Sequence, residues 1–226
     1  MHKRLMVVVA VLTMAVVGPW LPAHPTPQQP SQSFWQRLLQ QLWGGEPIDR
    51  GHGGFGGGRP VNCLISPDAS PIWHNRPLFV WQGDSTTIGV RLPGSESVLW
   101  RQTATPGATS NLRILQYDGP TLQPGQTYDW LFFVDRSSRK PAFWPSFQVM
   151  SARDRLAITA DLRRLEATLQ RQNATPEAIA FQRSQYFIQK RLWADAIQEI
   201  YAVKNPSPDL QQLTQEIEKK VCQSQK

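Results

Sequence analysis

The spacing of apolar residues changes near position 150 of this 226-residue chain. Before that point, short runs rich in Trp, Phe, Val and Ile are separated by turn residues about every ten residues, which is typical of antiparallel strands. After it, apolar residues recur at the spacing of amphipathic helices. We therefore predict an α+β chain with a β-sandwich domain over 61–150 and a helical domain over 151–226.

Six strands are expected in the first part, and a seventh near Cys63. They should form an antiparallel sandwich, because parallel strands would need helices between them. The six are Leu78–Gln82, Thr86–Leu92, Ser97–Gln102, Leu112–Tyr117, Thr127–Asp135 and Phe143–Met150.

Helix start signals divide the second part into four helices. Ser151 can cap the first helix, which should end near Asn173, and Thr175 followed by Pro176 marks the start of the second. Apolar residues at helical spacing predict the third and fourth helices, over Trp193–Val203 and Leu210–Val221.

Residues 1–23 have the layout of a signal peptide. Lys3 and Arg4 precede an apolar block from Leu5 to Val17, which is shorter than the roughly 20 residues that span a bilayer. Cleavage after Ala23 is expected, with retention as an anchor as the alternative. We therefore expect an exported protein, periplasmic or extracellular, with no permanent transmembrane span after cleavage.

A linker rich in Pro, Gln and Gly is predicted over 24–60. Within it, residues 34–43 are expected to form a short amphipathic helix that carries Phe34, Trp35 and Trp43 on its apolar face. So short a helix is marginal alone in water. Its apolar face should therefore cover the protein's own sandwich, a partner or a membrane surface.

Cys63 and Cys222 lie at the two ends of the predicted folded region. Export would expose them to oxidising conditions, so a disulfide between them is allowed. The alternative is two separate thiols, and sequence alone does not show whether the two α-carbons come close enough for a bond.

No recognised catalytic or metal-binding motif is present. His74 has no histidine or cysteine at ligand spacing and is expected to be a surface residue. Asp84, Asp118 and Asp129 stand where acidic residues are common in turns and at strand edges. We therefore expect neither catalysis nor a cofactor or metal, with a hydrolase built on distant carboxylates as a third possibility.

Nine tryptophans are an unusual feature of the chain. Trp81, Trp100, Trp130 and Trp144 fall in strand patterns and are expected to anchor the core. The alternative is a face of exposed aromatic rings that stacks on sugars, as some exported β-sandwiches use.

The formal charge is +7, and most basic residues alternate with acidic ones, which argues against a nucleic-acid-binding groove. A predicted hairpin loop is the exception. It carries Arg136, Arg139 and Lys140, and these charges could dock an acidic surface.

Residues 122–130, Leu-Gln-Pro-Gly-Gln-Thr-Tyr-Asp-Trp, resemble the penultimate strand of fibronectin type III and related immunoglobulin-like domains. Pro124 and Gly125 set the turn. Tyr128 can return its hydroxyl to nearby backbone, and Trp130 should enter the core.

The stretch Glu177–Pro208 resembles one tetratricopeptide repeat, with Ala196 as the small residue of its second helix. Arg183 and Ser184 depart from the usual Leu and Gly of the first helix. One repeat cannot bury its face alone, so it must pack on flanking helices, the sandwich or a second molecule.

Over the whole mature chain, several motifs resemble a cyanobacterial family of exported proteins known only as a domain of unknown function. They are the glycine-rich run ending in Gly-Gly-Arg before Cys63, the Pro-Gly-x-x-Tyr-x-Trp strand, the Asp135-Arg136-Ser137 turn and Leu-Trp-Ala-Asp-Ala at 192–196. The resemblance implies a signal, a β-domain and a helical tail, and it supplies no catalytic residues. The family often has a second cysteine just before the Asp-Arg-Ser turn. This chain lacks it, which favours an unpaired Cys63 or a bond to Cys222.

Taken together, these features predict a non-enzymatic interaction or scaffold module that binds another extracytoplasmic protein. The alternative is a cell-wall or polysaccharide-binding protein.

Overall fold

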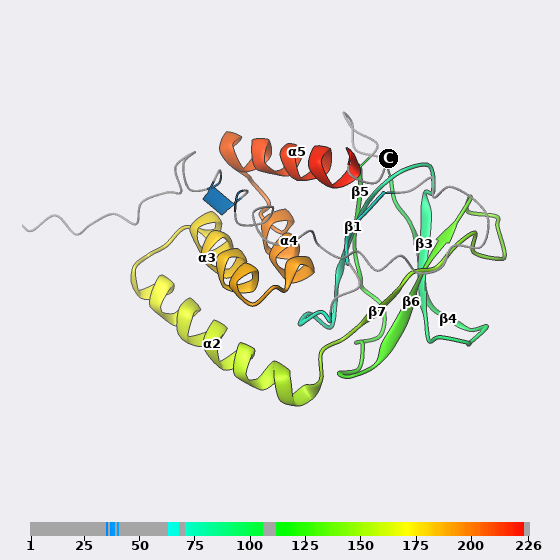
Figure 1. Ribbon diagram of the computed structural model, residues 1–226, viewed down its shortest axis with the longest axis horizontal. Helices are drawn as coiled ribbons and strands as arrows, with labels where there is room; N and C mark the ends of the chain where they lie inside the picture. Colours follow the sequence, from blue (N-terminus) through cyan, green and yellow to red (C-terminus); the bar gives the residue numbers. More distant parts are fainter. Residues whose placement is uncertain are drawn as a thin grey trace, which may run out of the picture.

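The computed structural model describes residues 35, 37, 38, 40, 63–67, 71–105 and 112–223. These residues form two antiparallel sheets and helices α2 to α5, so the chain is an α+β protein (Figure 1). The predicted signal segment and nearly all of the predicted linker lie outside the described residues. Among the described residues, no helix is both long and apolar enough to cross a membrane.

The strands lie where the sequence predicts them, in two sheets. The three-stranded sheet has the order β1-β2-β5, and the four-stranded sheet has the order β4-β3-β6-β7. Their bounds are β1 Cys63–Ser66, β2 Leu78–Gln82, β3 Thr87–Arg91, β4 Val98–Thr103, β5 Leu112–Gln116, β6 Thr127–Phe133 and β7 Ser146–Gln148.

The last strand is shorter than expected. Phe143 still forms an isolated bridge with Phe132 of β6, but regular pairing resumes only at Ser146. Pro145 between them has no backbone N–H to donate, so the ladder is interrupted there.

The helices also match their start signals. They are α2 Ala152–Arg171, α3 Pro176–Gln189, α4 Trp193–Tyr201 and α5 Pro208–Gln223. As predicted, the Ser151 hydroxyl accepts from the N–H of Asp154, and the Thr175 hydroxyl accepts from that of Ala178.

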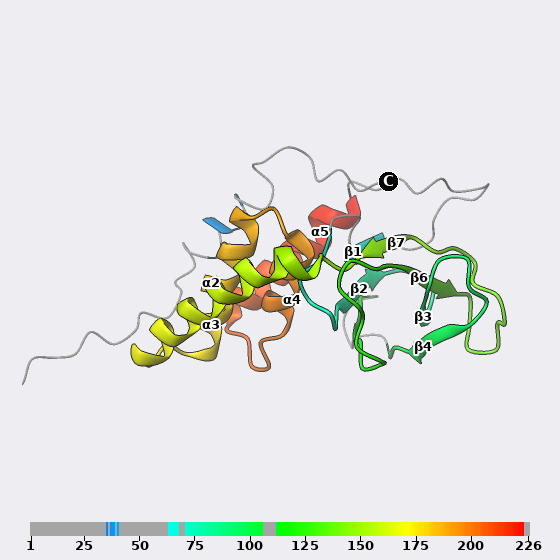
Figure 2. The ribbon, with the colours of Figure 1, turned by 90° about the horizontal axis from the view of Figure 1, so that it is seen from below.

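The three-stranded sheet is the middle layer of the molecule. On one face, Phe79 and Trp81 of β2 contact Trp130 of β6, with ring centroids 4.7 and 6.1 Å apart. On the other face, Leu78 and Val80 join an apolar core built largely by the helices. Side chains alternate along a strand, so β2 is buried on both faces. Figures 1 and 2 show the helices on one side of β1 and β2 and the second sheet on the other. Residues before position 150 therefore contribute to the same apolar core as the helices that follow it.

The turn before β6 has the expected hydrogen bond. The Tyr128 hydroxyl accepts from the backbone N–H of Gln123 at 2.8 Å, and the next inward residue, Trp130, is buried. This bond ties the start of β6 to the preceding turn.

Candidate functional site

Trp35 and Leu38, from the predicted short helix, lie inside the protein. Trp35 is 2% exposed and meets the ring of Phe181 on α3 edge-on, with centroids 4.9 Å apart. These two residues therefore pack in the core that the helices form with the three-stranded sheet. Trp35 does not belong to an open interaction surface, and Phe34 and Trp43 lie outside the described residues.

A disulfide joins Cys63 on β1 to Cys222 on α5, with the α-carbons 5.5 Å apart. It links the first strand to the last helix across a sequence separation of 159. The bond closes nearly the whole described fold into one covalent loop.

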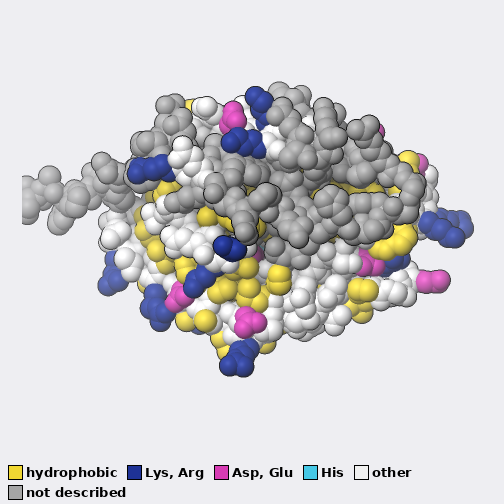
Figure 3. Space-filling view, viewed as in Figure 1, with side chains coloured by type: hydrophobic (Ala, Val, Ile, Leu, Met, Phe, Trp, Pro, Cys, Tyr) yellow, Lys and Arg dark blue, Asp and Glu magenta, His cyan; other side chains and the backbone are white. Residues whose placement is uncertain are grey.

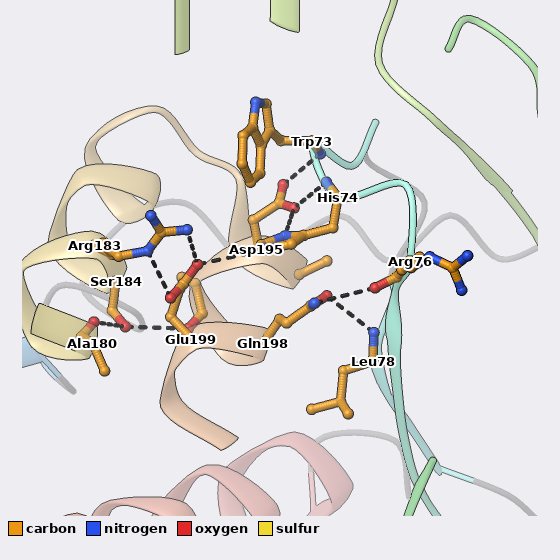
Figure 4. Close-up of polar contacts among 12 residues, drawn as sticks. Trp73, His74, Arg76, Leu78, Ala180, Arg183, Ser184, Asp195, Gln198 and Glu199 are labelled. Carbon is orange, nitrogen blue, oxygen red and sulfur yellow. Dashed lines mark hydrogen bonds and ion pairs between the residues drawn. The ribbon is translucent and has the colours of Figure 1, made fainter. Parts of the chain in front are cut away.

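A cluster of charges connects the loop before β2 to helices α3 and α4 (Figure 4). His74 Nδ1 lies 2.6 Å from Asp195 Oδ1, and the backbone N–H groups of Trp73 and His74 donate to the same carboxylate at 2.8 and 2.9 Å. Only 16% of the His74 side chain is exposed, so the expectation of a surface histidine is wrong. Its partner stands 121 residues later, and sequence spacing gives no sign of that contact.

Glu199, one turn after Asp195 on α4, extends this cluster toward α3. Its Oε1 lies 3.4 Å from His74 Nε2, and the Arg183 guanidinium donates to both of its oxygens at 2.7 and 2.8 Å. Gln198 adds two backbone contacts, because its side chain accepts from the N–H of Leu78 and donates to the carbonyl of Arg76.

The charges in this cluster stabilise one another. Burial alone would lower the pKa of His74, but hydrogen bonds to Asp195 and Glu199, together with their negative charges, outweigh burial and raise it. Burial alone would raise the pKa of Glu199, but hydrogen bonds from His74 and Arg183 outweigh burial and lower it. We name these four side chains, His74, Arg183, Asp195 and Glu199, the buried charge cluster. Their hydrogen bonds are made to each other and to nearby backbone, so the cluster holds the helices on the sheet.

In the part of the chain that the structure describes, no group of three His, Cys, Asp or Glu side chains could hold a metal ion. The three aspartates considered as distant carboxylates have separate surroundings. Asp118 accepts from the indole N–H of Trp100, Asp129 pairs with Arg91 at 3.0 Å, and Asp84 is exposed in the turn after β2.

The predicted hairpin loop with Arg136, Arg139 and Lys140 follows β6, and we name residues 135–140 the basic loop. The Asp135 carboxylate accepts from the N–H groups of Ser137 and Ser138, both at 2.8 Å, and from both hydroxyls. These hydrogen bonds, led by that of the Ser137 hydroxyl, lower the pKa of Asp135. The Asp135 carboxylate therefore accepts hydrogen bonds from within the loop, while Arg136, Arg139 and Lys140 are exposed.

Arg101 of β4 attaches the basic loop to the four-stranded sheet. Its guanidinium lies 3.8 Å from the ring centroid of Phe133 on β6, and its Nη2 donates to loop carbonyls, at 3.1 Å to Arg136 and 2.8 Å to Ser138. To reach them it crosses β3 at Gly89, its register partner. A Cβ at Gly89 would lie 2.9 Å from the Trp100 carbonyl oxygen and 3.3 Å from the Phe133 ring, so only glycine fits.

Strand β4 is an edge of its sheet, and only Trp100 among its six residues is buried. The N–H of Ala104 donates to the Thr86 carbonyl at 2.8 Å, toward β3. Because backbone direction alternates along an antiparallel strand, Gln102 also points toward β3, whereas Arg101 and Thr103 point their N–H and C=O groups away. Within the described ranges no strand pairs with this outer side, which we name the free edge of β4.

The free edge of β4 and the basic loop form one cationic surface. None of Arg101, Arg136, Arg139 and Lys140 forms an ion pair with an acidic side chain in the described part of the chain. At the end of the molecule that carries the four-stranded sheet, Figure 3 shows projecting Lys and Arg side chains, with Asp or Glu side chains nearby. The charge is thus open to solvent and available to a ligand.

Three of the four strand tryptophans anchor the core as predicted, since Trp81, Trp100 and Trp130 are all buried. Trp144 is the exception at 50% exposed, because it lies in the interrupted stretch beside Pro145 rather than in a regular strand. Its ring lies 5.1 Å from the Arg91 guanidinium. The described tryptophans therefore do not form a row of exposed rings.

Comparisons with protein-family models, with curated proteins and with solved structures find no match to this chain.

Sequence reasoning found the basic loop but missed the free edge of β4 and the role of Arg101. The available signal was the polar run Arg101-Gln102-Thr103 at the end of a predicted strand, which is typical of an exposed edge. Sheet order, which depends on long-range pairing, was needed to recognise it.

Proposed function

We propose that this chain is a non-enzymatic, exported interaction or scaffold protein that binds another extracytoplasmic protein. The observation that carries the proposal is the cationic surface formed by the free edge of β4 and the basic loop. The Arg101 guanidinium is held by loop carbonyls, and none of the four cations has an acidic partner among the described residues. Uncompensated charge of one sign favours encounter with a surface of the other sign.

We infer that the two sheets are an immunoglobulin-like sandwich of the fibronectin type III kind. The chain pairs β3 with β4, crosses to the other sheet for β5 and returns beside β3 for β6, which is a Greek-key path. The hydroxyl bond of Tyr128 to Gln123 has the form of the tyrosine corner of such domains.

We also interpret α3 and α4 as one tetratricopeptide-like helical pair. Ala196 is fully buried, and the Ser184 hydroxyl donates to the carbonyl of Ala180, with the Ala196 carbonyl 3.3 Å away. Serine replaces the usual glycine here because its small side chain fits between the helices and its hydroxyl is satisfied locally. Arg183, in place of leucine, supplies the partner of Glu199.

Export is supported by two features. The first is the cationic and then apolar start of the chain. The second is the Cys63–Cys222 bond, since structural disulfides persist mainly in oxidising compartments. The resemblance to cyanobacterial exported proteins of unknown function agrees with this location and remains a proposal.

One observation favours the second candidate, a cell-wall glycan. Trp144 is half exposed beside Arg91, and an exposed indole next to a hydrogen-bonding cation is a plausible sugar contact. A glycan pull-down with Trp144→Ala as the control tests it. Equal recovery of the two proteins would remove this candidate.

The proposed function is tested by site-specific photocrosslinking in cells that naturally make the protein. Crosslinkers are placed at Gln102, at Arg139 and, as a distant control, at the exposed Leu156 of α2. We expect the same discrete protein adduct from Gln102 and Arg139 and none from Leu156. Absence of a protein adduct at every position tested would contradict an interaction role.

A further inference from the structure

We propose that the free edge of β4 accepts an extended, acidic segment of a partner protein as a fifth strand of the four-stranded sheet. This inference rests on the proposed function and specifies the chemistry of the partner. It follows from two independent features, which are an exposed edge strand that pairs with no further strand in the described ranges and the positive charge of the neighbouring loop.

The backbone of β4 offers the hydrogen-bonding groups that strand addition needs. Arg101 and Thr103 direct their N–H and C=O groups outward, as the contact between Ala104 and Thr86 requires. A strand added there would lie about 4.8 Å from β4 and could pair with both residues. Main-chain bonds of this kind supply affinity in many peptide complexes, while side chains supply specificity.

The charges beside the edge define which segment fits. The Arg101 guanidinium itself reaches across β3 to the Phe133 ring and the loop carbonyls, so an added strand would be attracted by the positive charge of the exposed loop cations rather than by a direct pair with Arg101. Arg101 in turn bonds the backbone of the basic loop, which carries the exposed Arg136, Arg139 and Lys140. The Asp135 carboxylate accepts hydrogen bonds from Ser137 and Ser138, so the net charge of the loop is positive.

The opposite end of β4 differs in character. Val98 and Leu99 are 41% and 39% exposed, and Glu96 in the preceding turn is also exposed. Acidic residues are disfavoured there by like charge, and apolar ones can cover the two aliphatic side chains. A segment that alternates acidic and apolar residues can therefore serve both ends, with acidic residues toward the basic loop and apolar residues over Val98 and Leu99.

A second copy of this chain fits the edge less well. Antiparallel self-pairing of β4 centred on Arg101 would place the two Arg101 residues opposite each other, although the two basic loops would lie at opposite ends of the paired strands. Like charges across paired strands are destabilising, and charge on an edge strand is a known protection against self-association. We therefore assign the edge to an acidic partner.

The test uses the purified, disulfide-bonded chain and two fluorescent probes. The first is a peptide of about eight alternating Val and Asp residues, long enough to cover β4, and the second replaces every Asp by Lys. We expect the acidic probe to bind at least about tenfold more tightly than the basic one, with affinity that falls as salt rises. Backbone amide exchange of Arg101 and Thr103 should slow on binding, while that of Gln102, already paired to β3, should stay unchanged.

Two variants with a matched control separate backbone pairing from charge. Thr103→Pro removes an outward N–H, which an edge strand tolerates, whereas Thr103→Val keeps the amide and loses only the hydroxyl contact with Thr87. We expect Thr103→Pro to weaken acidic-probe binding about tenfold or more and Thr103→Val to bind like the parent. Reversing the loop charges with R136E, R139E and K140E together should abolish the preference for the acidic probe.

Several results would overturn the inference. They are equal binding of both probes, binding without slowed exchange at Arg101 and Thr103, formation of a β4-paired dimer, or no binding of the acidic probe. The exchange measurement on the parent protein does not depend on the variants, so a misfolded Thr103→Pro chain would not rescue the inference. If the probes fail but crosslinks in cells still form at Arg139, the proposed function stands and strand addition does not. If crosslinks fail as well, both are wrong.

Discussion

Two groups of charged residues in this protein differ in how their charge is satisfied. In the buried charge cluster, His74 and Arg183 each form an ion pair with a carboxylate on α4. In the surface formed by the free edge of β4 and the basic loop, Arg101 is bonded to loop carbonyls, and none of the four cations forms an ion pair with a carboxylate among the described residues. The charges of the first group are paired within the protein, whereas the cations of the second group can still attract an acidic ligand.

This difference separates a structural role from a binding role. A buried ion pair is costly to break because the remaining charge loses its partner in a low-dielectric site. Exposed charges contribute little to folding because solvent screens them. Substitutions in the two groups should therefore affect different properties, stability in one case and binding in the other.

The largest effect is expected from Asp195→Ala. This change leaves the N–H groups of Trp73 and His74 and the imidazole without their acceptor, and it should lower the free energy of unfolding by about 3 to 5 kcal/mol. Chemical denaturation followed by tryptophan fluorescence measures it. Asp195→Asn, which keeps an acceptor oxygen, should cost clearly less, and a loss below about 1 kcal/mol for Asp195→Ala would remove the structural role assigned to the cluster.

Loss of the disulfide should have the next largest effect. Replacing Cys63 and Cys222 together by Ser frees a loop of 159 residues in the unfolded chain, which should cost about 2 to 4 kcal/mol. The same denaturation experiment measures this change. Acidic-probe binding is the control, and it should stay intact because β4 is in the other sheet. Lost binding in a folded double variant would mean that the two regions are coupled.

A pH-dependent contribution is expected from His74. Its pKa is raised in the folded state, so its contribution to stability is fully present below the ordinary value of about 6.5 and is lost as pH rises through the folded-state pKa. The lowered pKa of Glu199 acts in the opposite direction, because its contribution is lost as pH falls below its ordinary range. Against His74→Gln, the parent should be more stable by about 1.5 to 3 kcal/mol near pH 6, and this difference should shrink at alkaline pH. A difference that does not change with pH would show that the pKa of His74 is the same in the folded and unfolded chain, contrary to the raised value expected from its contacts.

The smallest effect on stability is expected in the basic loop. The triple change R136E, R139E and K140E should alter the free energy of unfolding by no more than about 0.5 kcal/mol, because these side chains are exposed and form no ion pair in the described region. Thermal unfolding checks this value. A large destabilisation would show that these cations contribute to folding stability, as the residues of the buried charge cluster do.

The sequence predicted the elements well because their signals are local. The turn at Pro124 and Gly125, the caps at Ser151 and Thr175, and the alternation in β2 depend on neighbours within a few residues. Burial of β2 on both faces shows why its run Leu-Phe-Val-Trp is continuously apolar. Trp144 was misplaced because Pro145 weakens a strand that its apolar neighbours otherwise indicate.

The candidate site could be predicted only in part, because it depends on contacts between distant segments. The three cations of the loop are visible in the sequence, but their connection to β4 depends on Arg101 crossing over Gly89 to residues about 35 positions later. Likewise, nothing near His74 points to Asp195 or Glu199. Sheet order and helix docking decide both contacts, and neither is encoded in local spacing.

The most direct test of the central claim is residue-resolved amide hydrogen exchange of the intact protein, with and without the alternating Val-Asp peptide. The account predicts that slowed exchange appears at Arg101 and Thr103 of β4, and that the amides of Trp73 and His74 beside the buried charge cluster exchange as before. Unchanged exchange along β4 at saturating peptide, or slowed exchange only at the helices, would contradict it.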